Sequence, residues 1–296
     1  MPTKGVLKAT TAALNVWIRA PDASALTIGE VAQHIQQACL LIDDMEDNSS
    51  IRRGNPAAHA VFGHAQTLEA ANFLFVQTYK QARKMRSQDA IDILLEEVEN
   101  MMLGQCLDQH WKFELKPPSE EEYLNMVDNK TGAFFRLIIR LLQAETAHER
   151  AKALDFERFS TLLGRFYQIR DDLMNLRSGV YAELKGSCED LDEGKFSYPI
   201  VHCLVNSPAH RSHIIGIFRQ RPASMGGEPR PLSPQAKSHI MSCLEESGSL
   251  DAALGLVNEL QADIEAETAR LESAAGEQNP TLRALLKKLT LTNGIS

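Results

Sequence analysis

An all-α fold is predicted by the helical spacing of apolar residues, by its recurrence along the chain, and by the scarcity of strand-like alternation. The clearest stripe has members at i, i+3, i+4, i+7, i+10, i+11 and i+14, namely Ile28, Val31, Ala32, Ile35, Ala38, Cys39 and Ile42. This spacing places them on one face of a helix, which then packs against a core.

Further helices are expected in order along the chain, because the same spacing recurs at about 58–84, 89–112, 120–145, 155–178, 235–247 and 249–272. Prolines and glycines at 219–235 break the pattern and predict a surface loop rather than a domain linker. We therefore expect a single domain over 1–296. Its start, with "TKGVLK" two residues from Met1, also fits a shortened N-terminus.

Composition excludes several classes of protein. The chain has 296 residues, is 44% hydrophobic and carries a net charge of -8, which fits a globular protein and argues against a nucleic-acid binder. Its five cysteines are far apart, which favours reduced thiols over a disulfide framework. The start lacks a signal-peptide apolar region, and Arg136 and Arg140 interrupt the longest apolar run. A soluble, cytoplasmic protein without a membrane span is expected.

Two acidic motifs of matching spacing predict a magnesium site. The first comprises Asp43, Asp44 and Asp47, and the second comprises Asp171, Asp172 and Asn175, each at i, i+1 and i+4. Residues four apart share a helix face, and oxygen ligands suit Mg²⁺. A single acidic run is more often a solvated helix end, but two copies behind apolar stripes favour the metal site.

Basic residues near these motifs predict a diphosphate site. They are Arg52, Arg53, Lys130, Lys185 and Lys195. Each taken alone is more often a surface charge. Together with metal ions they could hold diphosphate oxygens, since arginine pairs with them in a planar fork and lysine acts as a point charge.

Four segments carry a resemblance to a known family: "LLIDDMEDNSSIRRGNPAAH", "KTGAFFRL", "QIRDDLMNL" and "KGSCEDLDEGKFSYPIVH". They resemble the trans-isoprenyl diphosphate synthases, particularly fungal-type geranylgeranyl diphosphate synthases and their relatives. The resemblance implies helices around a deep central cavity, with an acidic cluster on each side of its mouth. It also implies a homodimer or a higher oligomer.

The resemblance further implies the chemistry. Three Mg²⁺ ions held by Asp43, Asp47 and Asp171, with Asp44 and Asp172 beside them, would bind an allylic diphosphate and stabilise it as a leaving group. The residues that would neutralise the departing charge are Arg52, Lys130, Lys185 and Lys195. Gln168 and Thr131 match family positions near the reacting carbons, and Asn175 is expected among the substrate-binding residues.

The positions that bind the second substrate depart from the family pattern. Family members hold isopentenyl diphosphate through four basic residues, and here Lys4 and Arg53 remain while Leu7 and Gln36 stand in place of an arginine and a histidine. Drift, with Lys8 as a substitute, is one interpretation. The other is a different acceptor, with indole-3-glycerol phosphate as our first hypothesis, as in relatives that prenylate this indole with geranylgeranyl diphosphate.

Small residues one turn before Asp43 bear on the length of the prenyl chain. Ala38 and Cys39 would leave the cavity open, which favours a C20 chain, although close helix packing is an equally good explanation. Three functions stay open: a geranylgeranyl transferase acting on an indole, a geranylgeranyl diphosphate synthase, and a class I terpene cyclase.

Overall fold

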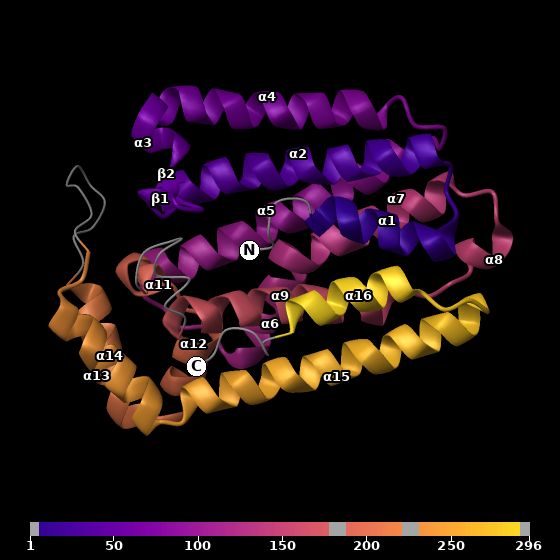
Figure 1. The fold of residues 1–296 in the computed structure, drawn as a ribbon. Coiled ribbons are helices and arrows are strands. Elements are labelled where there is room, and N and C mark those ends of the chain that lie inside the picture. Colours follow the sequence, from indigo (N-terminus) through magenta and orange to yellow (C-terminus); the bar gives the residue numbers. More distant parts are fainter. Residues whose placement is uncertain (1–5, 178–187, 221–230, 291–296) are drawn as a thin grey trace.

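The computed structural model describes residues 6–177, 188–220 and 231–290, and these are almost entirely helical (Figure 1). The helices are α1 (Val6–Ile18), α2 (Asp22–Glu46), α3 (Ala58–Phe62), α4 (His64–Ala82), α5 (Ala90–Glu114), α6 (Glu120–Val127), the π-helix η1 (Asp128–Gly132), α7 (Ala133–Glu145), α8 (Glu149–Lys152), α9 (Glu157–Arg177), α11 (Glu189–Glu193), α12 (Tyr198–Asn206), α13 (Pro208–Arg219), α14 (Pro234–Glu246), α15 (Ser249–Ala275) and α16 (Pro280–Leu289). The all-α prediction is confirmed. Lys4 and Lys185 lie outside the described residues.

The helices form a layered bundle (Figure 1). α2 packs between α1 and α4, while α5, α7 and α9 surround η1 in the centre. α15 runs along the opposite side of the bundle, against α9 and α12. The apolar stripe of α2 is buried as expected, since Ile28, Val31, Ala32 and Ile35 are fully shielded from solvent.

Two expected helices are interrupted. The segment 58–84 is broken at Gly63, whose φ of +80° belongs to the left-handed region that favours glycine. The segment 120–145 contains η1, a turn whose wider hydrogen bonding shifts the side chains that follow it. A short hairpin of β1 (Ile51–Arg52) and β2 (Asn55–Pro56) follows α2. Its turn, Arg53-Gly54, has positive φ at both residues, as the favoured two-residue hairpin turn requires.

Six helices of the structure were not predicted: α1, α8, α11, α12, α13 and α16. α1 shows the physical reason most clearly. Its exposed positions include Ala9 and Ala12 as well as Lys8, so it lacks the clearly polar face that reveals a surface helix. α8 and α11 are too short for a period to be recognised.

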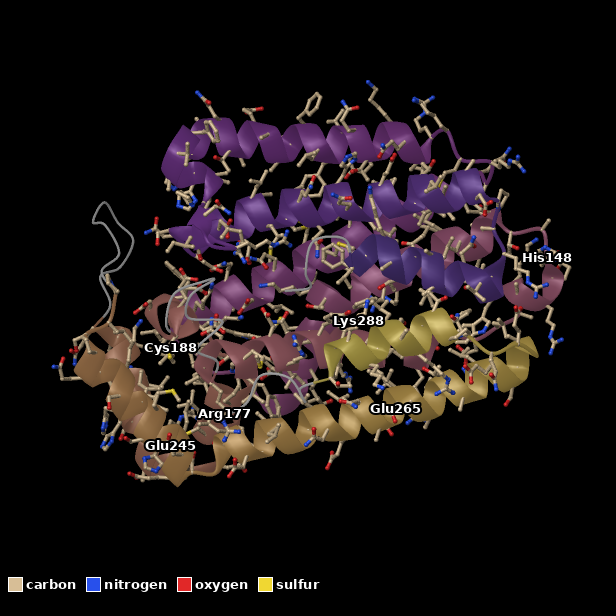
Figure 2. The ribbon with its side chains drawn as sticks, viewed as in Figure 1. His148, Arg177, Cys188, Glu245, Glu265 and Lys288 are labelled. Carbon is tan, nitrogen blue, oxygen red and sulfur yellow. The ribbon has the colours of Figure 1, made fainter. Side chains whose placement is uncertain are left out.

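The outer faces of α4 and α5 remain apolar and exposed. Phe73 and Val76 on α4, and Leu95 and Leu103 on α5, are between 48% and 62% exposed. Side chains of α4 project away from the rest of the bundle (Figure 2). Among the described residues, no helix is both long enough and apolar enough to cross a membrane.

Candidate active site

The first acidic motif lies at the end of α2, where its three aspartates face different partners. The Oδ1 atom of Asp43 accepts a hydrogen bond of 3.1 Å from Gln105 and lies 3.5 Å from the Nζ atom of Lys130. Asp47 accepts a hydrogen bond of 3.1 Å from Gln109 and pairs with Lys112. Asp44 is buried and accepts hydrogen bonds from Arg52, whose Nε atom lies 2.6 Å from the Oδ1 atom of Asp44. Asp43 and Asp47 line a polar compartment, and Asp44 holds Arg52 beside them.

The second motif lies on α9 and is divided in the same way. Asp171 and Asn175 line the polar compartment. Asp172 is only 1% exposed, and it accepts hydrogen bonds from the hydroxyl of Tyr123 at 2.5 Å and from the backbone N–H of Tyr198 at 2.9 Å. Its other oxygen accepts from Gln168 at 3.0 Å and from Lys195 at 3.1 Å. Asp172 therefore holds Gln168 and Lys195 in place.

Lysine side chains reach the acidic cluster from two sides. Lys130, on η1, donates to Asp108 of α5 at 2.8 Å in addition to its contact with Asp43. Lys195 bridges Asp172 and Asp190, whose Oδ2 atom lies 3.4 Å from its Nζ atom. Thr131 donates a hydrogen bond of 2.8 Å to Gln168, which joins η1 to α9. The structure thus places Arg52, Lys130 and Lys195 around one polar compartment.

The prediction from sequence missed the polar stripe of α5. Gln105, Asp108, Gln109 and Lys112 all contact the aspartates of α2 or the lysine of η1. Their spacing of three or four residues within a predicted helix was the available signal, because it gives a polar line on a helix that otherwise packs inward.

Electrostatics keep this site charged. Burial opposes ionisation of Asp43, but Lys130 and Arg52 outweigh it and hold the pKa of this carboxylate below its usual value. Burial also opposes the charge of Lys130, yet Asp108 and Asp43 raise its pKa. Burial, followed by repulsion from Asp47 and Asp190, raises the pKa of Glu193 well above its usual value. Burial and the neighbouring carboxylates therefore both disfavour the charged form of Glu193.

The donor set fits magnesium. The polar compartment is lined by carboxylate and amide oxygens of Asp43, Asp47, Asp171, Asn175 and Glu193. Hard oxygen ligands of this kind suit Mg²⁺, which also accepts phosphate oxygens. A cation held by these oxygens would also offset the repulsion that Asp47 and Asp190 exert on Glu193.

An apolar cavity continues inward from the same residues. Asp43, Lys130, Gln168 and Asp171 line both spaces, so they mark the junction between them. The walls of the cavity comprise Leu7, Gln36, Cys39, Ile42, Met101, Met102, Phe134, Phe135 and Tyr167, among others. An apolar lining with a few polar groups at one end is typical of small-molecule sites, and here it suits a hydrocarbon chain attached to a polar head.

Cys39, not Ala38, faces this cavity. Cys39 is one of its lining residues, whereas Ala38 is fully buried outside the lining. The two are neighbours on α2 and so point about 100° apart. Burial raises the pKa of the Cys39 thiol to about 12, which keeps this wall uncharged.

The structure also shows where the residues that depart from the family pattern lie. Leu7 and Gln36 both line the apolar cavity. His34 points elsewhere, with its Nδ1 atom 3.2 Å from the Oε1 atom of Gln81 on α4. Lys8 packs against Gly29, with its Cγ atom 3.5 Å from where a Cβ atom on Gly29 would lie. It does not line the apolar cavity, which disfavours Lys8 as a substitute for the missing arginine. Arg53, in the hairpin turn, lines neither space.

Glycines allow η1 to sit between α5 and α9. A Cβ atom on Gly104 would lie 2.4 Å from the backbone nitrogen of Lys130, and one on Gly164 would lie 2.5 Å from the Cα atom of Gly132. Since both neighbours are backbone atoms, neither contact can be relieved by a change of rotamer.

We expect Gly104→Ala to displace Lys130 from the acidic cluster. The variant should lose at least about 1–3 kcal/mol of unfolding free energy, because the added methyl group overpacks the helix contact. Gly216→Ala on α13, where an added Cβ meets nothing within 4 Å, is the matched control and should be neutral or stabilising. Urea unfolding of both variants provides the measurement. Equal stability of the two would contradict the close contact.

The comparisons with known proteins agree with this geometry. Residues 2–227 match the polyprenyl synthetase family, and the chain belongs to it. It is 48% identical over 296 residues to the bifunctional terpene synthase FUP1 of Fusarium proliferatum, covering 100% of this chain and 39% of that protein. It is 48% identical over 291 residues to sesterfisherol synthase of Neosartorya fischeri, covering 98% of this chain and 38% of that protein. Geranylgeranyl pyrophosphate synthase 3 of Zymoseptoria tritici is 43% identical over 289 residues, covering 98% of this chain and 78% of that protein.

The chain therefore spans about two fifths of the length of the terpene synthases that it matches. Its family membership identifies it as a prenyltransferase-type enzyme, as predicted. Two of these relatives are named as terpene synthases and the third as a geranylgeranyl pyrophosphate synthase.

Proposed function

We propose that the chain carries out magnesium-dependent elongation of an allylic prenyl diphosphate, with isopentenyl diphosphate as the acceptor. One observation carries this proposal. The acidic faces of α2 and α9 and the lysine of η1 meet where the polar compartment opens into a long apolar cavity. This arrangement separates a place for a diphosphate from a place for a hydrocarbon chain.

Different residues would bind the metal ions, neutralise the leaving group and exclude water. Asp43, Asp47 and Asp171 would hold magnesium ions, three in number by the family resemblance, and bound magnesium would stabilise the diphosphate as a leaving group. When the allylic C–O bond breaks, its electron pair leaves with the diphosphate, and Lys130, Lys195 and Arg52 offset the negative charge. The apolar walls exclude water, which would otherwise capture the allyl cation. The acceptor's π-bond then forms the new C–C bond, and a proton leaves.

Product identification tests this proposal against its alternatives. The protein would be incubated with Mg²⁺ and geranylgeranyl or farnesyl diphosphate, together with isopentenyl diphosphate, indole-3-glycerol phosphate or no acceptor. We expect a lengthened diphosphate from the first mixture. A prenylated indole would instead support our first hypothesis, and a hydrocarbon formed without acceptor would support a cyclase.

We expect Cys39→Phe to shorten the product. Cys39 lines the cavity one turn inward from Asp43, so a phenyl ring there would obstruct the growing chain. Cys39→Ala serves as the control and should keep or lengthen the product. Chromatography of the dephosphorylated products measures chain length. If both variants give the parent's product, the chain does not pass this residue.

We also propose that the exposed apolar faces of α4 and α5 join two copies of the chain. Four residues there, Phe73, Val76, Leu95 and Leu103, are at least 48% exposed, and apolar patches of this kind are typical of interaction sites. Sedimentation at micromolar concentration should show a dimer. Replacing Phe73 and Leu103 with glutamate should give a monomer, and a parent protein that is already monomeric would contradict the proposal.

A further inference from the structure

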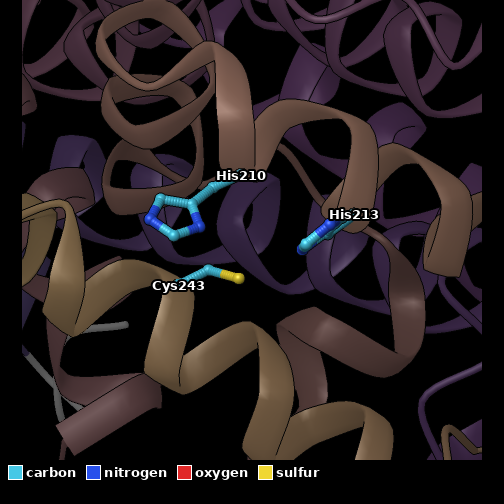
Figure 3. A group of neighbouring side chains, drawn as sticks. All are labelled: His210, His213 and Cys243. Carbon is cyan, nitrogen blue, oxygen red and sulfur yellow. The ribbon is translucent and has the colours of Figure 1, made fainter.

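A cluster of histidine and cysteine side chains lies between α13 and α14, at the edge of the bundle. Ligand atoms of His210, His213 and Cys243 all lie within 4.8 Å of one another. The three side chains point toward a common space between the two helices (Figure 3). None of them lines the apolar cavity or the polar compartment described above.

A fourth side chain adjoins this cluster. The Nε2 atom of His239 lies 3.2 Å from the Nδ1 atom of His213 and 4.0 Å from the Sγ atom of Cys243. The helices explain why four such groups meet. His210 and His213 are three residues apart on α13, and His239 and Cys243 are four residues apart on α14, so each pair occupies one helix face.

We propose that His210, His213, His239 and Cys243 form a binding site for a zinc-class metal ion that links α13 to α14. Three imidazole nitrogens and one thiolate are a ligand set that suits zinc and not magnesium. In a tetrahedral zinc site, neighbouring ligand atoms lie about 3.3–3.6 Å apart, given Zn–N and Zn–S bonds of ~2.0–2.3 Å. Bringing the ligand atoms to this spacing requires side chains to move, and His213 and His239 are exposed and therefore free to adjust their rotamers.

The surroundings favour a structural role for this ion. Cys243 is 2% exposed, so its sulfur would close the inner side of the site, while His213 is exposed and leaves a path for the ion. The Nε2 atom of His210 lies 3.7 Å from a carboxylate oxygen of Glu246, which is beyond hydrogen-bond distance but leaves a carboxylate on the side of the ring away from the proposed ion. α13 buries only Ile214 and Phe218, so a metal link would add substantially to its attachment.

Binding would release one proton from Cys243 as the thiolate forms, and no oxidation is involved. The expected consequence is a higher melting temperature, because a ligand that binds only the folded chain stabilises it. This inference concerns a different site from the proposed prenyl chemistry and does not depend on it.

A cobalt and zinc titration tests the site. Chelator-treated protein is kept in saturating Mg²⁺, so that the acidic cluster is occupied, and is then titrated with Co²⁺. We expect a thiolate-to-cobalt charge-transfer band together with the visible bands of tetrahedral cobalt. Competition with a chromophoric chelator then measures zinc affinity, and zinc should raise the melting temperature.

Variants test whether these four side chains are responsible for metal binding. Cys243→Ser should abolish the charge-transfer band and weaken zinc binding at least about tenfold. Should this buried substitution prevent folding, the double variant His210→Gln, His213→Gln takes its place. His148→Gln, an exposed histidine outside the cluster, is the matched control and should bind as the parent does. Absence of the band in the parent, or equal zinc affinity in the cluster variants, would overturn the proposal.

Discussion

Asp43→Ala and Asp171→Ala should each reduce turnover of an allylic diphosphate by at least about 10²–10³-fold, because each removes a carboxylate that would hold the magnesium ions needed to stabilise the leaving diphosphate. Both aspartates line the polar compartment and the apolar cavity, so they stand where the reacting C–O bond would lie. Steady-state release of diphosphate at saturating Mg²⁺ measures the effect.

The Asp43→Ala variant should still fold. Lys130 keeps its ion pair with Asp108 at 2.8 Å when Asp43 is removed, so no buried lysine is left alone. Asp263→Ala provides the matched control, since Asp263 pairs with Arg158 at the surface of α15 and should leave turnover unchanged. Full activity of either site variant, or of the parent in excess EDTA, would refute the proposed chemistry.

The sequence predicted the part of the site that local spacing encodes. Asp43 and Asp47 share a helix face because they are four residues apart, and so do Asp171 and Asn175. The sequence could not show that Asp44 and Asp172 would turn inward, because that depends on partners distant in the chain. Asp172 is held by Tyr123 and Lys195, whose positions follow only from the packing of α6 and α12 against α9.

The same limit applies to the walls of the cavity. Periodicity placed Ala38 and Cys39 one turn before Asp43, but only the packing of α1, α4 and α7 against α2 decides which of them faces the cavity. The π-turn of η1 was also hidden, because its spacing departs from the helical period used to find helices. Its signal lies in Gly104 and Gly164, which allow backbone contacts that no side chain would tolerate.

The double variant Leu7→Arg, Gln36→His should raise kcat/KM for isopentenyl diphosphate by about 100-fold. A hydrogen bond to a charged group contributes ~1.5–3 kcal/mol, which is roughly tenfold or more for each restored donor. Leu7 on α1 and Gln36 on α2 line one cavity, so both new side chains could reach the same diphosphate. The gain should appear mainly in KM, because these residues would bind the acceptor rather than the leaving group.

Lys8→Met is the matched control for this experiment. Lys8 follows Leu7 in the chain but packs against Gly29 outside the cavity, so its loss should leave KM for isopentenyl diphosphate unchanged. If Lys8→Met raises KM strongly, Lys8 rather than a restored arginine is the cation that the acceptor uses. A folded double variant with the parent's KM would show that the acceptor diphosphate binds elsewhere. Should the double variant gain isopentenyl diphosphate use while losing transfer to indole-3-glycerol phosphate, Leu7 and Gln36 would be the residues that select the acceptor.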